Sequence, residues 1–307
     1  MADIRKIKKV LKGRPVVEGA GVHLKRALGN EGAVPMFDPF LLLDDFHSFN
    51  PAQYLPGFPW HPHRGIETIT YVLEGEVDHG DSMGNKGMIH PGDVQWMTAG
   101  SGIIHQEMPR GLKDGHLWGF QLWANLPASH KMMDPRYQGI TSNRIPQVVT
   151  DNGAKVKIIC GQFNKVQGPV RDIVTDPEYL DIALPPNSQF RHAIGKGRTA
   201  MAYILEGAGI FDDNHDPYSF EEVEENYFDF KRERLFSPEH LIAFTDGDDV
   251  LVTTENKPVR FLLISGNPLR EPVAWYGPIV MNTQGELRTA FEEYQKGDFI
   301  KHKQPQK

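Results

Sequence analysis

Short runs in which apolar and polar residues alternate cover most of this 307-residue chain, and glycines or prolines end nearly every run. Residues 66–74 (IETITYVLE) are typical, because both alternating sets contain apolar atoms, as in a strand covered on both faces. Turn signals such as Gly84-Asn85 and Pro91-Gly92 then recur at intervals of about 8–12 residues. This pattern predicts an all-β fold of barrels or sandwiches.

The second half of the chain repeats the pattern of the first. Residues 202–207 (AYILEG) echo residues 70–75 (TYVLEG) at an offset of 132, and residues 246–248 (DGD) echo residues 91–93 (PGD) at an offset of 155. The 23 additional residues coincide with an acidic stretch, residues 212–239, which we interpret as an insertion. Two copies of one β-unit are therefore expected.

The polar, turn-rich segment that follows Leu126 separates the two copies. We place the domain boundary in this segment, so that residues 1–137 form the first domain and residues 138–307 form the second. The second domain then contains the acidic loop, residues 212–239, and the end of the chain.

A helix is predicted only near the C-terminus. Thr283 and Glu286 form a capping-box pair, and apolar residues follow at i, i+3, i+4 and i+7 from Leu287. Gly297 is a typical stop signal. We therefore expect an amphipathic helix over about residues 284–297, with its apolar stripe packed on a barrel.

Two pairs of polar residues bound the stretch 61–107. His61 and His63 open it, and His105 and Glu107 close it. Side chains at positions i and i+2 of a strand point to the same face, so each pair presents two ligands in one direction. If the intervening chain folds back, three imidazoles and one carboxylate meet at one point. That set suits a divalent transition metal better than Mg²⁺ or Ca²⁺, which prefer oxygen ligands.

The second copy has no counterpart to this set of four. His61 and His63 correspond to Ala193 and Gly195 at one offset, and His105 and Glu107 correspond to Arg260 and Leu262 at the other. We therefore expect a metal in the first domain and no metal ligands in the second. Four other histidines are expected at turns or on the surface: His79, His90, His116 and His130.

Composition narrows the class of protein. The chain is 39% hydrophobic and 24% charged, as in an ordinary globular protein, and no apolar run approaches the length of a membrane span. The net charge of −7 argues against direct nucleic-acid binding.

A single cysteine, Cys160, excludes an internal disulfide framework and indicates a reducing compartment, the cytoplasm or the nucleus. The basic start lacks the apolar core of a signal peptide, and we expect a cytoplasmic monomer.

Charge is unevenly distributed along the chain. Residues 212–229 contain eight carboxylates and no lysine or arginine, whereas residues 5–14 contain six basic side chains. One interpretation is that the acidic residues form a solvated loop and that the basic residues lie on an edge strand, where their charge prevents pairing with another chain. The other is a surface that binds a protein partner.

Longer motifs resemble the pirin family of the cupin superfamily. The motifs are DPFLLLDDF (38–46), HPHRGIETITYVLEGEVDHGDSMGNKG (61–87), PGDVQWMTAGSGIIHQEMP (91–109), GFQLWANLP (119–127) and EPVAWYGPIVMNT (271–283). The resemblance implies two tandem cupin (jelly-roll-like) β-barrels, with one mononuclear metal, usually iron, in the N-terminal barrel. It makes His61, His63, His105 and Glu107 the ligands. Glu67 stands where the general cupin motif has its glutamate, and we expect it to be structural.

The resemblance also implies a chemistry. Three imidazoles and one carboxylate leave two positions of an octahedral Fe(II) open, which fits an oxygenase that takes a small aromatic substrate and O₂. The implied activity is that of quercetin 2,3-dioxygenase, which opens a flavonol ring and releases carbon monoxide, with Glu107 as general base. The alternative is a non-enzymatic, metal-dependent regulator that binds a protein partner. Zinc, nickel, copper and manganese would accept the same ligands.

Overall fold

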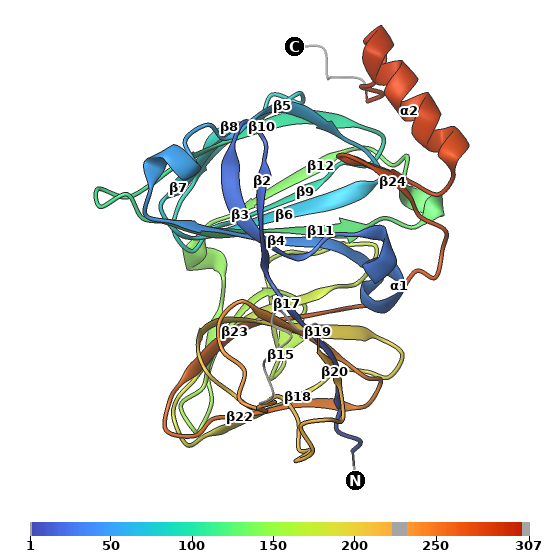
Figure 1. Ribbon diagram of the computed structural model, residues 1–307. Helices are drawn as coiled ribbons and strands as arrows, with labels where there is room; N and C mark the ends of the chain where they lie inside the picture. Colours follow the sequence, from blue (N-terminus) through green and yellow to red (C-terminus); the bar gives the residue numbers. More distant parts are fainter. Residues whose placement is uncertain (1, 223–231, 303–307) are drawn as a thin grey trace. The chain divides into compact units, whose positions relative to one another are not determined.

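The computed structural model describes residues 2–222 and 232–302, which form an all-β protein with a C-terminal helix (Figure 1). The strands make two tandem barrels, so the all-β fold of two β-units with a C-terminal helix that the sequence predicted is confirmed. Contacts divide the chain into two compact units. The first barrel comprises residues 14–35, 39–144 and 269–307, and the second comprises residues 1–13, 36–38 and 145–268.

This division differs from the expected domains 1–137 and 138–307. The internal boundary lies near residue 144. Each terminal segment, however, belongs to the barrel formed mainly by the other half of the chain: residues 1–13 belong to the second barrel and residues 269–307 to the first. The physical reason is strand pairing and side-chain bonding between segments far apart in sequence, which periodicity along the chain does not reveal.

The first barrel is built from a seven-stranded sheet of order β12-β9-β6-β11-β4-β3-β2 and a four-stranded sheet of order β5-β10-β7-β8. A short hairpin, β24-β25, and the helix α2 complete it. The bounds are β2 Arg14–Glu18, β3 Val22–Leu28, β4 Phe40–Ser48, β5 Phe58–His63, β6 Ile66–Glu74, β7 Glu76–Asp81, β8 Lys86–Ile89, β9 Val94–Thr98, β10 Ile103–Arg110, β11 Leu117–Asn125, β12 Arg136–Ile140, β24 Ala274–Tyr276, β25 Ile279–Met281 and α2 Gln284–Lys296.

The second barrel contains an eight-stranded sheet of order β13-β14-β17-β23-β19-β21-β1-β20 and the pairs β18-β22 and β15-β16. The bounds are β1 Ile7–Lys12, β13 Gln147–Val149, β14 Lys155–Cys160, β15 Gln162–Phe163, β16 Val166–Gln167, β17 Glu178–Leu184, β18 Gln189–Ala193, β19 Thr199–Gly207, β20 Glu221–Glu222, β21 His240–Phe244, β22 Asp249–Thr253 and β23 Val259–Gly266. The short helix α1 spans Val34–Phe37, and single 3₁₀ turns span Glu31–Ala33, Pro51–Gln53, Ala128–His130 and Ser142–Arg144.

The repeated motif occupies equivalent central strands. Strands β6 and β19 carry the two copies, and eight of the nine residues of β6 and six of the nine residues of β19 are buried. This agrees with a sequence pattern that has apolar atoms on both faces of the strand.

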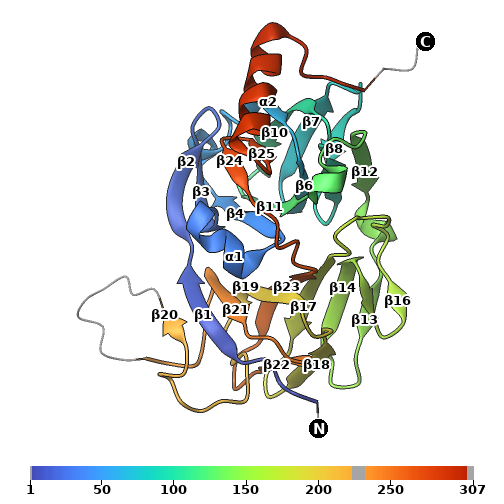
Figure 2. The same cartoon turned by 90° about the vertical axis from the view of Figure 1, so that its right-hand side faces the viewer.

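The helix α2 begins and ends where the sequence predicted. Thr283 and Glu286 form the reciprocal capping box, and Gly297 ends the helix with a left-handed φ of 80°. Leu287 and Ala290 are buried, and the helix packs on the β24-β25 hairpin of the first barrel (Figure 2). No helix among the described residues has both the length and the apolar character needed to cross a membrane.

The basic start and the acidic stretch lie in the same barrel and contact each other. Strand β1 lies between β21 and β20, so its interpretation as an edge strand is wrong. Lys6 pairs with Asp213, and Lys9 pairs with Glu221 at 3.1 Å. Residues 223–231 of the acidic stretch lie outside the described residues.

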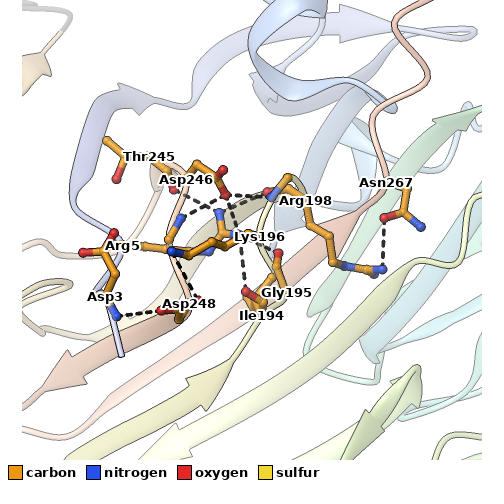
Figure 3. Close-up of polar contacts among 12 residues, drawn as sticks. Asp3, Arg5, Ile194, Gly195, Lys196, Arg198, Thr245, Asp246, Asp248 and Asn267 are labelled. Carbon is orange, nitrogen blue, oxygen red and sulfur yellow. Dashed lines mark hydrogen bonds and ion pairs between the residues drawn. The ribbon is translucent and has the colours of Figure 1, made fainter. Parts of the chain in front are cut away.

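Arg5 anchors the N-terminal segment in the second barrel (Figure 3). Its side chain is fully buried. Nη1 donates to the carbonyl oxygens of Arg198 and Thr245 at 3.0 and 2.9 Å, and Nη2 donates to that of Gly195 at 2.9 Å. One guanidinium therefore saturates carbonyls from two loops that would otherwise lack these partners.

Replacing Arg5 with methionine is expected to destabilise the protein. The change leaves several buried carbonyl oxygens without their charged donor, which costs about 3 kcal/mol of unfolding free energy. Lys6→Met is the matched control, because its exposed ion pair contributes at most about 1 kcal/mol. Urea unfolding of the two variants and the wild type measures the difference. Equal stability of the two variants would contradict the anchoring role.

Candidate metal centre

Strands β5 and β10 bring the two pairs of candidate ligands together. The strands are antiparallel neighbours, and the register places His61 opposite His105 and Ile103 opposite His63. The register shifts between His105 and Glu107, so that Glu107 stands opposite Phe58. The i, i+2 spacing keeps both members of each pair on the interior face of the barrel.

Three of the four candidate ligands form one cluster. The ligand nitrogens of His61, His63 and His105 all lie within 4.8 Å of one another. His63 and His105 are almost fully buried, and His61 is half-buried. The structure thus places the three histidines together, with Glu107 beside the cluster rather than within it.

The rings of the cluster converge on a common point instead of pointing at each other. The Nε2 atoms of His61 and His63 are 3.1 Å apart, and their ring centroids are 4.8 Å apart. His47 and His116 on the barrel surface have the same Nε2 distance, 3.1 Å, but a centroid separation of 5.2 Å. The wider separation indicates a nearly head-on contact for the surface pair. Two imidazoles bound to one ion at about 2.1 Å and near right angles have nitrogens roughly 3 Å apart, as His61 and His63 do.

Backbone carbonyls fix the orientation of two of these rings. His61 Nδ1 lies 2.8 Å from the carbonyl oxygen of Pro59, and His63 Nδ1 lies 2.9 Å from that of Pro278. Donation from Nδ1–H leaves the Nε2 lone pair facing the centre. His105 is fully buried, and neither of its nitrogens has a hydrogen-bond partner among the described residues. A buried imidazole with two unsatisfied nitrogens fits a metal ligand.

Burial keeps all three imidazoles neutral at neutral pH. It lowers the pKa of His61, it lowers the pKa of His63 to about 3 together with the neighbouring His61, and it lowers that of His105 well below its ordinary value. Neutral imidazole is the form that binds a metal. The donor set therefore fits a divalent transition metal, since nitrogen ligands are already deprotonated and converge on one point.

Glu107 is held by three neighbouring side chains. Thr70 Oγ1 donates to its Oε1 at 2.6 Å, Gln121 Nε2 donates to its Oε2 at 3.1 Å, and Gln95 Nε2 lies 3.4 Å from Oε1. Burial raises the pKa of Glu107, while the bonds from Thr70 and Gln121 lower it. These hydrogen bonds restrict rotation of the Glu107 carboxylate. Its oxygens still have lone pairs free to bind a metal or a proton.

A cavity of about 540 Å³ adjoins the cluster, a size typical of small-molecule sites. His61, His63 and Glu107 line it together with aromatic and apolar side chains. Trp123 packs edge-on against His63 with a centroid distance of 5.1 Å, and Trp275 also lines the wall. A flat apolar molecule can therefore reach the imidazoles.

Sequence reasoning missed several residues of this site. Thr70, Gln95 and Gln121 lie on strands that were predicted, but no pattern marked their contact with Glu107. Pro278 and Trp275 belong to the AWYGP segment near the C-terminus, which the motifs singled out without assigning it to the first barrel.

The sequence-based prediction for His79, a position at a turn or on the surface, is wrong. His79 is buried on β7 and stacks on Tyr137, with ring centroids 4.8 Å apart. Its position opposite Glu107 in the β7-β10 register turns it to the interior face. His90 and His130 are exposed and His116 is half-buried, as expected for turn or surface histidines.

Glu67 lies in the barrel interior without joining the cluster. Its Oε1 accepts from Thr98 Oγ1 at 2.7 Å, and burial raises its pKa from about 4.5 to about 7. Between these two values the folded protein binds a proton that the unfolded chain has released. Glu67 therefore lowers stability as pH rises through this window.

The pH dependence of stability tests this assignment. Between about pH 4.5 and 8, the wild type is expected to lose about 3 kcal/mol more unfolding free energy than Glu67→Gln, which cannot ionise. Urea unfolding at four or more pH values measures both curves. Parallel curves would contradict a raised pKa at Glu67.

The second barrel presents different side chains at the corresponding places. Its His192 lies 3.0 Å from the carboxylate of Glu178 and is half-buried. Gly195 offers its carbonyl to Arg5. Among the described residues, the three histidines of the first barrel are the only cluster of three or more side chains with ligand-like proximity.

Fold and site together define a bicupin whose first barrel carries a metal-type histidine cluster. Comparisons with known proteins agree. The Pirin family model matches residues 21–124, and the model of the Pirin C-terminal cupin domain matches residues 179–300. The chain is 41% identical over 298 residues to a pirin-like protein of Caulobacter vibrioides, covering 96% of this chain and 99% of the relative. The chain belongs to the pirin family.

Solved structures show the same fold. A quercetin 2,3-dioxygenase from Acinetobacter baumannii has a TM-score of 0.81 at 28% identity, covering 97% of this chain and all of the other. The bacterial pirin YhhW from Escherichia coli, solved in complex with nickel(II), has a TM-score of 0.59 at 21% identity, covering 84% of this chain and 98% of the other. The second likeness supports the fold alone.

Proposed function

We propose that this protein is a metal-dependent dioxygenase that cleaves a flavonol such as quercetin with O₂. The observation that carries the proposal is a cluster of three neutral imidazoles, with a carboxylate beside it, next to an aromatic-lined cavity. Likeness to a quercetin 2,3-dioxygenase at 28% identity supports the reaction class. Iron(II) is the proposed metal, and His61, His63, His105 and Glu107 are the proposed ligands.

The proposed chemistry divides between the metal and the chain. A bound divalent metal supplies open positions for oxygen ligands and lowers the pKa of a coordinated hydroxyl. Glu107 accepts the hydroxyl proton at a carboxylate oxygen, because burial raises its pKa and makes it a better base. Trp123 and Trp275 line the cavity and offer ring faces and edges to an aromatic substrate.

Gln121 and Thr70 keep the base in place during this transfer. Their bonds to separate oxygens of Glu107 hold the carboxylate plane in the cavity wall. A protonated Glu107 can keep the bond from Thr70, so the proton can return to product without rearrangement of the barrel.

A turnover assay tests the proposal. Protein loaded with Fe(II) is expected to consume O₂ and to bleach flavonol absorbance, with carbon monoxide released. His63→Ala is the control, because it removes a proposed ligand whose ring is fixed by Pro278. Turnover by the wild type no faster than by this variant would refute the dioxygenase proposal.

A second candidate function is metal-dependent regulation through a protein partner. The segment that leads to His61 favours it, because Leu55 in the loop before β5 and Trp60 on β5 expose 53% and 50% of their surface. Exposed large apolar residues beside a metal centre suit a surface whose shape depends on the metal. Partners recovered equally by wild type and His105→Ala in a pull-down would exclude metal-gated binding.

A further inference from the structure

A continuous row of polar side chains crosses the cavity side of the seven-stranded sheet. The register pairs Arg26 with Asp44, Asp44 with Gln121, and Gln121 with Thr70 on successive strands. All four side chains line the cavity. The row starts beside Glu107, to which Gln121 and Thr70 donate. Because neighbouring strands are about 4.8 Å apart, the row ends at Arg26 about 10 Å from Gln121.

The far end of the row is a cluster of three charged residues, Arg26, Asp44 and Glu18, here called the Arg26 cluster. Nε and Nη2 of Arg26 donate to the two oxygens of Asp44 at 2.8 Å each, and Nη1 donates to Glu18 Oε1 at 2.9 Å. Burial raises the pKa of Asp44 to about 6, so this carboxyl is mainly ionised at neutral pH. Two carboxylates and one guanidinium give the cluster a net charge of −1.

The Arg26 cluster retains acceptor capacity toward the cavity. Each carboxylate has about four lone-pair positions, and the three bonds from Arg26 occupy three of the eight. The Asp44 side chain is 7% exposed, whereas that of Glu18 is 44% exposed. Glu18 therefore gives a ligand an accessible carboxylate, and Asp44 gives the surrounding negative charge.

Apolar side chains flank the polar row on the same strands. Leu24 precedes Arg26 by two positions, and Leu42 and Phe46 lie two positions on either side of Asp44. All three line the cavity. A planar aromatic molecule can thus lie along the row with its edge on the polar groups and its faces on apolar atoms.

Resting on the proposed function, we infer that the Arg26 cluster recognises the end of the substrate remote from the metal. It selects aromatic substrates that carry an uncharged hydroxyl donor there, and it rejects substrates that carry an anion. A hydroxyl can donate to Glu18, whereas a carboxylate meets the net negative charge of the Arg26 cluster.

Three flavonols that are identical at the metal-binding end test this inference. Galangin lacks a hydroxyl on the remote ring, kaempferol carries one, and a kaempferol analogue carries a carboxylate in its place. Binding is measured without oxygen, by quenching of tryptophan fluorescence in metal-loaded protein, since Trp123 and Trp275 line the cavity. The wild type is expected to bind kaempferol about fivefold tighter than galangin and at least about tenfold tighter than the carboxylate analogue.

Glu18→Gln separates a charge effect from a structural one. The amide keeps an acceptor for Arg26 and for a hydroxyl but removes one negative charge. Affinity for the carboxylate analogue should rise at least about fivefold, affinity for kaempferol should fall about threefold because a hydroxyl bonds an amide more weakly than a carboxylate, and affinity for galangin should not change. Glu76→Gln, an exposed carboxylate paired with His90 outside the cavity, is the matched control and should leave all three affinities unchanged.

The outcomes distinguish this inference from the proposed function. Equal binding of the three flavonols, or equal changes for all three in Glu18→Gln, would overturn the role of the Arg26 cluster. If the wild type still cleaves flavonols, the proposed function stands without it. Absence of binding by every flavonol would overturn both.

Discussion

Replacing His105 with alanine is expected to abolish metal retention. His105 is fully buried, its nitrogens have no partner among the described residues, and it stands opposite His61 in the strand register. Loss of a ligand costs more than the 10–100-fold typical of groups that only orient ligands, so affinity should fall at least about 100-fold. Flavonol turnover should fall to background with it. Elemental analysis after dialysis measures the metal content.

A surface histidine gives the matched control for this variant. His130 is exposed and bonds Ser129, so His130→Ala should retain full metal content and turnover. His61→Ala repeats the test at a half-buried proposed ligand, where the substitution disturbs the core less than at His105. Normal metal content in both His61→Ala and His105→Ala would contradict the proposed centre.

Replacing Glu107 with glutamine is expected to separate catalysis from binding. The amide occupies the same space but cannot accept the substrate proton, so kcat should fall about 10²–10⁴-fold. Three imidazoles and the amide oxygen of the new side chain can still hold the metal, and the cavity walls are unchanged, so at equal metal content the flavonol affinity should stay within about threefold. Steady-state kinetics and fluorescence quenching measure the two quantities.

The comparison for Glu107→Gln is again Glu76→Gln, which makes the same chemical change at an exposed position. This control should keep wild-type kcat. A variant at Glu107 that retained full kcat would exclude the carboxylate as the base and would leave it, at most, a ligand. A parallel loss of kcat and flavonol affinity would indicate a structural role instead.

The strand pattern and the spacing of the two candidate-ligand pairs could be predicted from the sequence because both are local properties. Alternation with period two places His61 and His63 on one face of a strand wherever that strand lies in the fold. The capping box at Thr283 and the stop at Gly297 are local in the same sense, and α2 has these bounds.

The residues that surround the site could not be predicted from the sequence, because their positions depend on the register between strands. Whether Gln121 contacts Glu107 depends on which strands pair and at which residue, and a shift of one residue would turn it to the other face. The same applies to His79, whose burial follows from its place opposite Glu107 on β10. No local pattern distinguishes it from a surface histidine.

By itself, the sequence determined the all-β bicupin fold, the C-terminal helix and four candidate metal ligands, of which three lie in one cluster. Only the tertiary structure decided which segments complete each barrel. Residues 269–307 join the first barrel, where Pro278 fixes His63 and Arg64 bonds Glu293 at 2.7 Å. Residues 1–13 join the second barrel through β1 and Arg5. The reason is physical: side-chain direction along a strand is set by neighbouring residues, whereas these assignments rest on hydrogen bonds between residues more than 180 positions apart.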